Sequence, residues 1–392
     1  MKVGDLANLA RALVPGGARE GALSAALGDF TGVRDVFLVS SGRAAMTLIL
    51  EALGAAHEGD EVLVPGYTCY SVAASAIRAG LKVRPLDVSP EDLDYARLTE
   101  ADGRNAVAVV SANLYGAPND LPRLEGYARE QGIALVDDAA QALGATVSGR
   151  AVGTFGDVGI FSFDKGKNIT TIQGGVIVCS DAALAEKLAT VVDRLPEPGA
   201  RSVARDFGSV LAYAAFLRPS LYWIPNSLLT LGETPFEVDY PTTRYPRQLE
   251  SLASGQLKRL HRLSESRRAV AAALRARLED VQGVVLPGSS AGEGVALRFA
   301  LLLPDRRVRD ETRDLLVEAG IGATASYPKP LIDVPEVQPH LAPGVEDTPG
   351  ARDIANRVLT LPTHSFVGDR EMDRIEDCIR TSLGGYRGVV TG

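Results

Sequence analysis

Residues Leu135 to Val178, LVDDAAQALGATVSGRAVGTFGDVGIFSFDKGKNITTIQGGVIV, are the stretch that decides the fold. They contain most of three short apolar runs, at Ile133–Val136, Val158–Phe163 and Val176–Cys179, which are separated by turns and small residues. Short apolar runs bounded by turn signals are typical of strands that are buried on both faces. The stretch therefore predicts three buried strands.

Chemically useful side chains follow these runs. The first run ends in a carboxylate pair, Asp137 and Asp138, and the second carries Ser162 near its end, followed by a loop with Lys165 and Lys167. Two adjacent aspartates are ordinarily turn or helix-capping residues, and a loop lysine is ordinarily solvated. Pyridoxal phosphate, however, requires a carboxylate that keeps its pyridine nitrogen protonated and a lysine that holds its aldehyde as a Schiff base. The stretch fits that cofactor.

The same stretch resembles the sugar aminotransferases of the DegT/StrS family, which belong to the fold type I pyridoxal phosphate enzymes. The family pattern is a DAAQ- or DAAH-like turn, GD-x-G-x-FSF, the Schiff-base lysine followed by Asn or another small residue, and a Gly-Gly strand start. The pieces here are Asp138-Ala139-Ala140-Gln141, Gly156-Asp157, Phe161-Ser162-Phe163, Lys167-Asn168 and Gly174-Gly175. Each piece alone is a weak signal, but their order and spacing together are specific.

The resemblance implies a role for each matching residue. Lys167 is expected to form the Schiff base and to move protons at the substrate carbon. Lys165 is the competing lysine, but the family's lysine sits five positions after the serine of FSF, which is Lys167. Asp138 is expected to pair with the pyridine nitrogen, Gln141 to approach the phenolic oxygen of the ring, and Ser162 to bind the phosphate.

A phosphate site is expected upstream, after the apolar run Val36–Val39. Ser40-Ser41-Gly42-Arg43 precedes a helical pattern over Arg43–Ala55. A helix start leaves backbone N–H groups free at the positive end of the helix dipole, which favours an anion. Relatives usually have Ser-Gly-Thr here, so Gly42 and Arg43 match the phosphate-binding positions, with Arg43 replacing threonine. An ordinary helix cap is the alternative interpretation.

The ring-stacking position is a departure from the family pattern. Pro65-Gly66-Tyr67-Thr68-Cys69-Tyr70 resembles the family's P-x-x-T-[FWY] segment, in which the aromatic residue stacks on the cofactor ring. Cys69 occupies that position, so Tyr67 or Tyr70 is expected to supply the ring, and the sequence leaves the choice open. Asn113-Leu114-Tyr115-Gly116 resembles the family's HLYG turn and is expected to shape the substrate side.

Short apolar runs alternate with helical patterns as far as Cys179. The candidate strands are Val36–Val39, Glu61–Val64, Lys82–Pro85, Ala106–Val110, Ile133–Val136, Val158–Phe163 and Val176–Cys179. The candidate helices include Arg43–Ala55, Ser71–Arg78, Pro122–Gln131 and Ala182–Arg194. This alternation indicates an α/β fold with a mostly parallel sheet covered on both faces and ligands outside the strand carboxyl ends. We expect a three-layer αβα large domain over residues 1–243.

A smaller α/β domain is expected over residues 244–392. Its expected elements are a long linking helix over Gln256–Leu278, strands at Val284–Leu286 and Ala296–Leu303, and helices over Val308–Ala319 and Asp369–Ser382. The segments Ser326–Leu331 and Leu361–His364 resemble the family's HYPxPLH and LPLH segments. The resemblance therefore covers nearly the whole chain, although loosely beyond Cys179.

The resemblance also implies a homodimer. Arg244 and Gln256-Leu257 match a weaker family stretch from which residues reach across the dimer interface to the neighbour's phosphate site. Arg244 is therefore expected to lie near a cofactor. Thr242 replaces the Asn that makes this contact in relatives, which puts that contact in doubt but not the dimer.

The resemblance lapses over an insert at residues 195–241. Leu211–Leu231 is mostly apolar, but Arg218, Pro219 and Pro225 interrupt it, which argues against a membrane-spanning helix. We expect a buried helical hairpin over the active site or in the dimer interface. A membrane-facing lid for a lipid substrate is the alternative.

Composition agrees with a cytoplasmic enzyme that takes small-molecule substrates. The net charge of −8 argues against general nucleic-acid binding, which uses basic surfaces. The three cysteines lack metal-ligand spacing, so neither a metal site nor a disulfide framework is expected. The N-terminus has no long apolar core of the kind found in signal peptides.

Three functions are consistent with these observations. The first is an aminotransferase that makes an amino sugar from a nucleotide-linked keto sugar, with glutamate or glutamine as amino donor. The second is another pyridoxal phosphate reaction on the same scaffold, such as decarboxylation, elimination or acyl condensation. The third, a non-catalytic regulator, is disfavoured by the intact set of Asp138, Gln141, Ser162 and Lys167.

Overall fold

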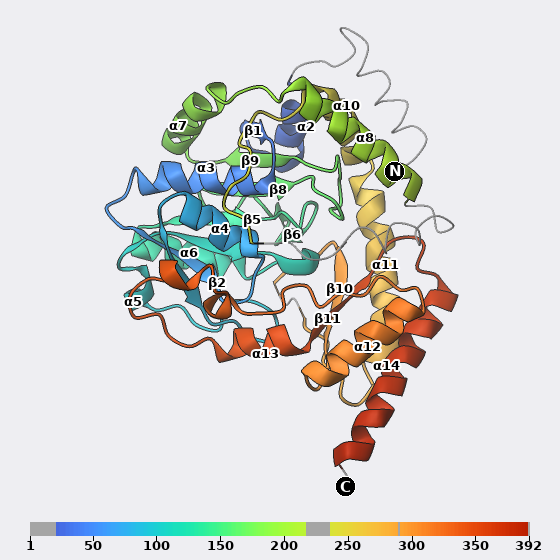
Figure 1. Cartoon of the computed structure of the whole chain (residues 1–392). Coiled ribbons are helices and arrows are strands. Elements are labelled where there is room, and N and C mark those ends of the chain that lie inside the picture. The colour runs from blue at the N-terminus through green and yellow to red at the C-terminus, as the bar shows by residue number, and fades with distance from the viewer. Residues whose placement is uncertain (1–20, 217–235, 289–290, 391–392) are drawn as a thin grey trace.

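The structure, a computed structural model, describes residues 21–216, 236–288 and 291–390 (Figure 1). Its centre is a seven-stranded sheet in the order β1-β9-β8-β5-β4-β2-β3. The strands are β1 (Asp35–Val39), β2 (Glu61–Pro65), β3 (Lys82–Leu86), β4 (Ala106–Ala112), β5 (Ala134–Asp138), β8 (Val158–Ser162) and β9 (Gly175–Cys179). Only β9 runs antiparallel to its neighbours β1 and β8, while the strands from β8 to β3 pair in parallel. The expected mostly parallel sheet is confirmed.

Helices cover both faces of this sheet (Figure 1). One face packs against α3 (Gly42–Gly54), α4 (Tyr70–Arg78) and α7 (Ala182–Asp193), and the other against α2 (Ala22–Thr31), α6 (Leu121–Gln131) and α10 (Arg247–Leu257). Successive side chains of a strand point to opposite faces. Thus Val62 and Val64 of β2 belong to the first core and Leu63 to the second, and all three are fully buried. This is the predicted three-layer αβα arrangement.

Several helices begin at capping side chains that the sequence supplies. The Ser41 hydroxyl accepts the backbone N–H of Ala44 at 3.0 Å and starts α3. Asp120 and Asp181 cap α6 and α7 in the same way. Such a side chain satisfies an N–H group that has no partner inside the helix. The remaining short elements of this part are α5 (Glu100–Gly103), η1 (Leu114–Gly116) and the hairpin of β6 (Thr146–Val147) with β7 (Arg150–Ala151).

A second core lies in the C-terminal part, at the lower right of Figure 1. There β10 (Arg298–Leu302) pairs antiparallel with β11 (Val358–Pro362), and α12 (Arg306–Glu318) and α14 (Asp369–Val390) pack beside them. Three further elements, α13 (Pro349–Arg357) and the 3-10 turns η2 (Leu331–Asp333) and η3 (Gln338–His340), connect this part to the large sheet. The second α/β core is as expected, while α13 and β11 were not predicted.

Two expectations for this part are wrong. The long helix Gln256–Leu278 is two helices, because α10 ends at Leu257 and α11 (Leu260–Leu278) begins after Arg259, whose φ of −115° and ψ of 6° are not helical. The strand at Val284–Leu286 is reduced to a single bridge between Val285 and Leu302. Pro287 follows directly and has no N–H to continue the pairing. The division at residue 243 stays a prediction, although Leu249 and Leu252 of α10 lie in the core of the large sheet.

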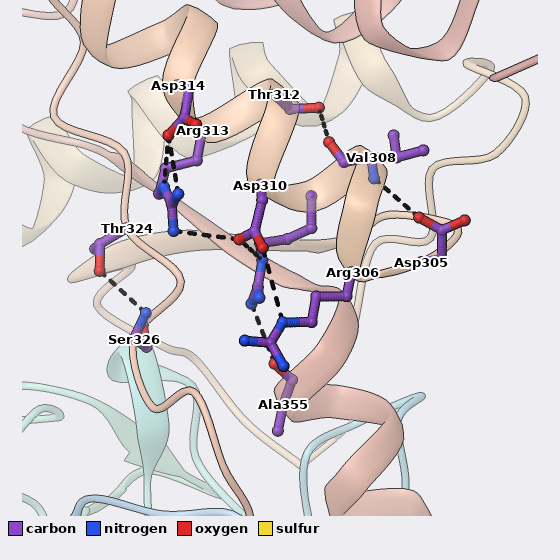
Figure 2. Close-up of polar contacts among 11 residues, drawn as sticks. Asp305, Arg306, Val308, Asp310, Thr312, Arg313, Asp314, Thr324, Ser326 and Ala355 are labelled. Atoms are coloured by element: carbon purple, nitrogen blue, oxygen red, sulfur yellow. Dashed lines mark hydrogen bonds and ion pairs between the residues drawn. The ribbon is translucent and has the colours of Figure 1, made fainter. Parts of the chain in front are cut away.

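An ionic network around the buried Arg309 fastens α12 to α13 (Figure 2). Arg309 is 2% exposed, and its guanidinium donates to Asp310 at 2.8 Å and to the backbone oxygen of Ala355 at 3.1 Å. Arg313 reaches the same Asp310 carboxylate at 3.2 Å. A buried charge is tolerated when it is paired and fully hydrogen-bonded. The network therefore fixes the end of α13, which leads directly into β11.

The described part of the insert forms α8 (Ala200–Phe216). Phe207 and Val210 of α8 are buried in the core of the large sheet, whereas Leu211 is 52% exposed. Most of the apolar run Leu211–Leu231 lies outside the described residues, so its expected role as hairpin or lid stays a prediction. Among the helices that are described, none combines the length and apolar character needed to cross a membrane.

Candidate active site

The two carboxylates at the end of β5 have different surroundings. Asp137 is fully buried and accepts the backbone N–H groups of Gly153 at 2.6 Å and Phe155 at 3.2 Å, and the side-chain amide of Asn113 at 2.9 Å. Burial raises the pKa of Asp137 to about 6, against the lowering effect of these hydrogen bonds. All of its described contacts are structural, and Asp137 holds together the loops that follow β4 and β7.

Asp138 lies within electrostatic reach of Lys167. Its carboxylate accepts the backbone N–H of Ala140 at 2.9 Å. Burial raises the pKa of Asp138, while the positive charge of Lys167 acts in the opposite direction. The strand end therefore presents one aspartate to the protein interior and the next one to the lysine, as alternation along a strand requires.

The loop that carries Lys167 is held at several points. The N–H of Lys167 donates to Asp164 O at 3.3 Å, and the side chain of the neighbouring Asn168 donates to Leu143 O at 3.1 Å. The Gln256 side chain bonds both backbone groups of Thr170, at 3.1 and 2.8 Å. Lys167 is half-buried and Lys165 is exposed. Gln256 thus links α10 to this loop, a long-range contact that the sequence pattern did not indicate.

Ser162 and Gly42 meet where β8 ends and α3 begins. A methyl group built on Gly42 would lie 3.3 Å from the Ser162 hydroxyl oxygen, and one on Gly175 would collide with Ser41 O at 2.1 Å. Glycine therefore permits the start of α3 to approach the end of the sheet. Ser162 is 6% exposed, and its oxygen accepts the N–H of Asp164 at 3.3 Å. The geometry places a hydroxyl beside a helix N-terminus, a combination suited to an anion.

Arg43 and Arg244 are engaged elsewhere within the chain. Arg43 forms an ion pair with Glu237 at 2.7 Å, and its guanidinium lies 4.9 Å from the centre of the Tyr240 ring. Arg244 donates to Asp193 O at 2.7 Å and lies 3.7 Å from Glu197. These contacts fasten the end of the insert to α3 and the following Arg244 to α7. Both arginines remain predicted cofactor contacts, because no cofactor or partner chain tests them.

Four tyrosines and Gln141 form a connected group on the other side of β5. The Tyr67 and Tyr115 hydroxyls lie 3.0 Å apart, and Tyr70 and Tyr67 pack against the Tyr327 ring with centroids 5.8 and 5.7 Å away. Gln141 accepts the N–H of Tyr115 at 2.9 Å and donates to the Tyr327 hydroxyl at 3.1 Å. Burial raises the pKa of Tyr67 and Tyr327 well above its usual value. Both hydroxyls are therefore neutral.

Tyr327 was expected only as part of the segment that resembles HYPxPLH, although it contacts three of the predicted site residues, Tyr67, Tyr70 and Gln141. Ser326-Tyr327-Pro328 lies about 190 residues from Gln141 in the chain, and no local pattern connects them. Cys69, at the start of α4, is half-buried, and its sulfur accepts the Ser71 hydroxyl at 3.0 Å. That Tyr67 or Tyr70 stacks on the cofactor ring stays a prediction.

The donor set fits pyridoxal phosphate. The buried hydroxyl oxygen of Thr68 has no hydrogen-bond partner among the residues that the structure describes. A buried hydroxyl without a partner costs free energy, which a bound phosphate oxygen would recover. Asp138 suits a protonated pyridine nitrogen and Lys167 an aldehyde. The N-terminus of α3 and the Ser162 hydroxyl supply further donors for the phosphate.

The three-layer fold is that of the fold type I aminotransferases. Residues 7–209 and 250–380 match the model of the DegT/DnrJ/EryC1/StrS aminotransferase family, and the chain belongs to this family. The unmatched interval, residues 210–249, contains the last seven residues of α8 and the part of the insert that lies outside the described residues. The predicted family, fold class and enzyme class are confirmed.

Curated relatives and solved structures agree with this assignment. The chain is 29% identical to the erythromycin biosynthesis sensory transduction protein EryC1 of Saccharopolyspora erythraea, over 86% of this chain and 82% of the relative. It is 28% identical to the UDP-N-acetyl-3-dehydro-alpha-D-glucosamine 3-aminotransferase of Acidithiobacillus ferrooxidans, over 93% and 88%. The crystal structure of the aminotransferase TlmJ from Streptoalloteichus hindustanus superposes with a TM-score of 0.78 at 26% identity, covering 99% and 98% of the two chains.

Proposed function

We propose that this aminotransferase uses pyridoxal phosphate to convert a nucleotide-linked keto sugar to an amino sugar, with glutamate or glutamine as amino donor. The observation that carries the proposal is that Asp138, at the end of β5, lies within electrostatic reach of Lys167, while the adjacent Asp137 is occupied by structural hydrogen bonds. The sugar substrate is supported by relatives such as the 3-aminotransferase of Acidithiobacillus ferrooxidans, whose name specifies a UDP-linked keto sugar.

The residues of this chain have separable tasks in that reaction. Bound pyridoxal phosphate supplies an electron sink for the substrate carbon. Asp138 holds a proton at the pyridine nitrogen, since a buried carboxylate is stabilised by a cationic partner. Lys167 removes and returns the proton at the carbon that carries the amine. Because amino transfer has two half-reactions, the same lysine serves both of them.

The role of Gln141 depends on the fixed orientation of its side chain. Its carbonyl is held by the Tyr115 N–H and its amide by the Tyr327 hydroxyl, so the side chain is fixed at the end of β5. We propose that it lies against the phenolic oxygen of the ring. The Thr68 and Ser162 hydroxyls and the first N–H groups of α3 bind the phosphate.

The proposal also covers the oligomeric state and the domain boundary. We propose a homodimer and a large domain ending near residue 243, as the family resemblance implies. Sedimentation equilibrium supports the dimer if the mass is twice 41.3 kDa, and a monomer at micromolar concentration contradicts it.

The half-reaction with the amino donor tests the function. Protein loaded with pyridoxal phosphate is mixed with each amino acid in turn, and the absorbance of the bound aldehyde form is followed. Glutamate or glutamine should convert it to the amine form, and a nucleotide-linked keto sugar should restore it. Conversion by no amino acid, or loss of carbon dioxide from the amino acid instead, contradicts the proposal.

A further inference from the structure

Helix α8 of the insert contacts the loop that carries the candidate Schiff-base residue, the lysine loop (residues 164–173), near both of its ends. At the far end, the Gln173 side-chain amide donates to the carboxylate of Asp206 on α8, which is 4% exposed. Near the start, the backbone N–H of Gly166 donates to the Tyr213 hydroxyl at 3.3 Å. Asp206 and Tyr213 lie about two turns of helix apart, so both project from the same face of α8. One face of this helix therefore spans the lysine loop.

Apolar residues lie between these two polar contacts. Phe207 and Val210 of α8 are buried in the same core as Ile169 and Ile172 of the lysine loop. Ile172 has a φ of 75°, a rare conformation for a β-branched residue and one that persists only where the surrounding structure enforces it. Helix α8 is therefore part of the packing that holds a strained loop shortly after Lys167.

The part of the lysine loop next to Lys167 is the least enclosed. Residues 164–166 are exposed, and the N–H groups of residues 164, 165 and 167 donate to near neighbours in the chain. Among the residues that the structure describes, only the Tyr213 side chain hydrogen-bonds this stretch from elsewhere in the fold. Because Gly166 and Lys167 share a planar peptide bond, an anchor on Gly166 also restrains the backbone that carries the lysine side chain.

We propose that Tyr213 is a positioning residue for Lys167, because its hydroxyl holds the Gly166 N–H and so keeps the lysine ready for attachment to pyridoxal phosphate. In that attachment the lysine nitrogen forms a C=N bond with the aldehyde carbon, and the aldehyde oxygen leaves as water with the two amine hydrogens. A pre-positioned amine pays less entropy in this step. Residues 210–249 lie outside the matched family intervals, so the insert supplies this contact. The inference rests on the proposed function, which takes Lys167 as the attachment residue.

Comparing two forms of the cofactor isolates the contribution of the lysine. Pyridoxal phosphate binds through its phosphate and ring and also attaches to Lys167, whereas pyridoxamine phosphate has the same phosphate and ring but no aldehyde. The ratio of their two dissociation constants, measured by equilibrium dialysis, therefore reports the attachment. In Tyr213→Phe the affinity for pyridoxal phosphate should fall by about three- to tenfold, because reordering the loop costs about as much as one lost hydrogen bond. The affinity for pyridoxamine phosphate should stay within about twofold of the wild type, since its binding needs no attachment.

Tyr127→Phe is the matched control. Tyr127 on α6 is also half-buried, and its hydroxyl also makes one hydrogen bond to the backbone, to Thr99 O at 2.9 Å, without involving α8 or the lysine loop. Its removal should leave the affinities for both cofactor forms unchanged. Hydrogen exchange of the full chain gives a second measurement, in which the Gly166 N–H should exchange faster in Tyr213→Phe than in the wild type and at the wild-type rate in Tyr127→Phe.

The outcomes separate this inference from the proposed function. An unchanged affinity for pyridoxal phosphate in Tyr213→Phe, or an equal loss for both cofactor forms, overturns the positioning role even if the protein transfers amino groups. Exchange of the Gly166 N–H at the wild-type rate in Tyr213→Phe overturns it as well. A selective loss for pyridoxal phosphate in a protein that aminates no nucleotide-linked keto sugar leaves the role of Tyr213 standing and contradicts the proposed function.

Discussion

Asp137 and Asp138 are adjacent at the end of β5, yet the Asp137 carboxylate accepts three hydrogen bonds from the protein interior, whereas the Asp138 carboxylate lies within electrostatic reach of Lys167. The difference follows from strand geometry, in which neighbouring side chains point to opposite faces. The sequence expectation that Asp138 alone can reach the cofactor ring rests on the same geometry.

We predict that Asp138 is needed mainly for catalysis and Asp137 mainly for stability. Asp138→Ala should lower turnover by several powers of ten, because the pyridine nitrogen loses the carboxylate that holds its proton. Asp137→Ala should lower the free energy of unfolding by about 1–3 kcal/mol or more, since three buried donors lose their acceptor, and should spare most of the activity. Steady-state rates and urea unfolding of both variants provide the comparison. Equal losses of activity would be evidence against the assignment.

The raised pKa of Asp137 predicts a dependence of stability on pH. The native protein holds this proton more tightly than the unfolded chain, whose aspartates titrate near pH ~4. The contribution of Asp137 is therefore fully present below pH ~4 and is lost as the pH rises through about 6. Asp137→Asn removes the titrating group, so the difference in unfolding free energy between wild type and variant should change across this window. A difference that is constant between these pH values would contradict the shift.

Gly42 is predicted to be required for phosphate binding. In Gly42→Ala the new methyl group would lie 3.3 Å from the Ser162 hydroxyl and displace one of the proposed phosphate donors. Affinity for pyridoxal phosphate should fall by about tenfold, the cost of one charged hydrogen bond. Folding should be unaffected or slightly improved, because alanine favours the helix. Gly126→Ala in α6, where nothing lies within 4 Å, is the matched control and should bind the cofactor normally.

Most of the large sheet could be predicted from sequence because its signals are local. Apolar runs such as Val158–Phe163 are long enough to be recognised, and the helices between them carry their own caps, as Ser41 does for α3. The carboxyl ends of parallel strands meet at one edge, which brings Asp138 and Ser162 into the same region without further information.

The features that could not be predicted from the sequence depend on contacts between distant segments. The helical pattern of Gln256–Leu278 contains no local signal for the break between α10 and α11. Near that break, the Gln256 side chain bonds the backbone of Thr170, which is distant in the chain. The ion pair of Arg43 with Glu237 links residues 194 positions apart. Tyr327 meets Gln141 for the same reason, through packing of the C-terminal part against the large sheet.

Mapping the covalent attachment of pyridoxal phosphate tests the central claim most directly. Protein loaded with the cofactor is reduced with borohydride, digested and sequenced by mass spectrometry. The modified residue should be Lys167, and Lys167→Ala should still bind the cofactor through Thr68, Ser162 and the start of α3, but without covalent attachment. Modification of Lys165, or no modified lysine in this loop, would contradict the account.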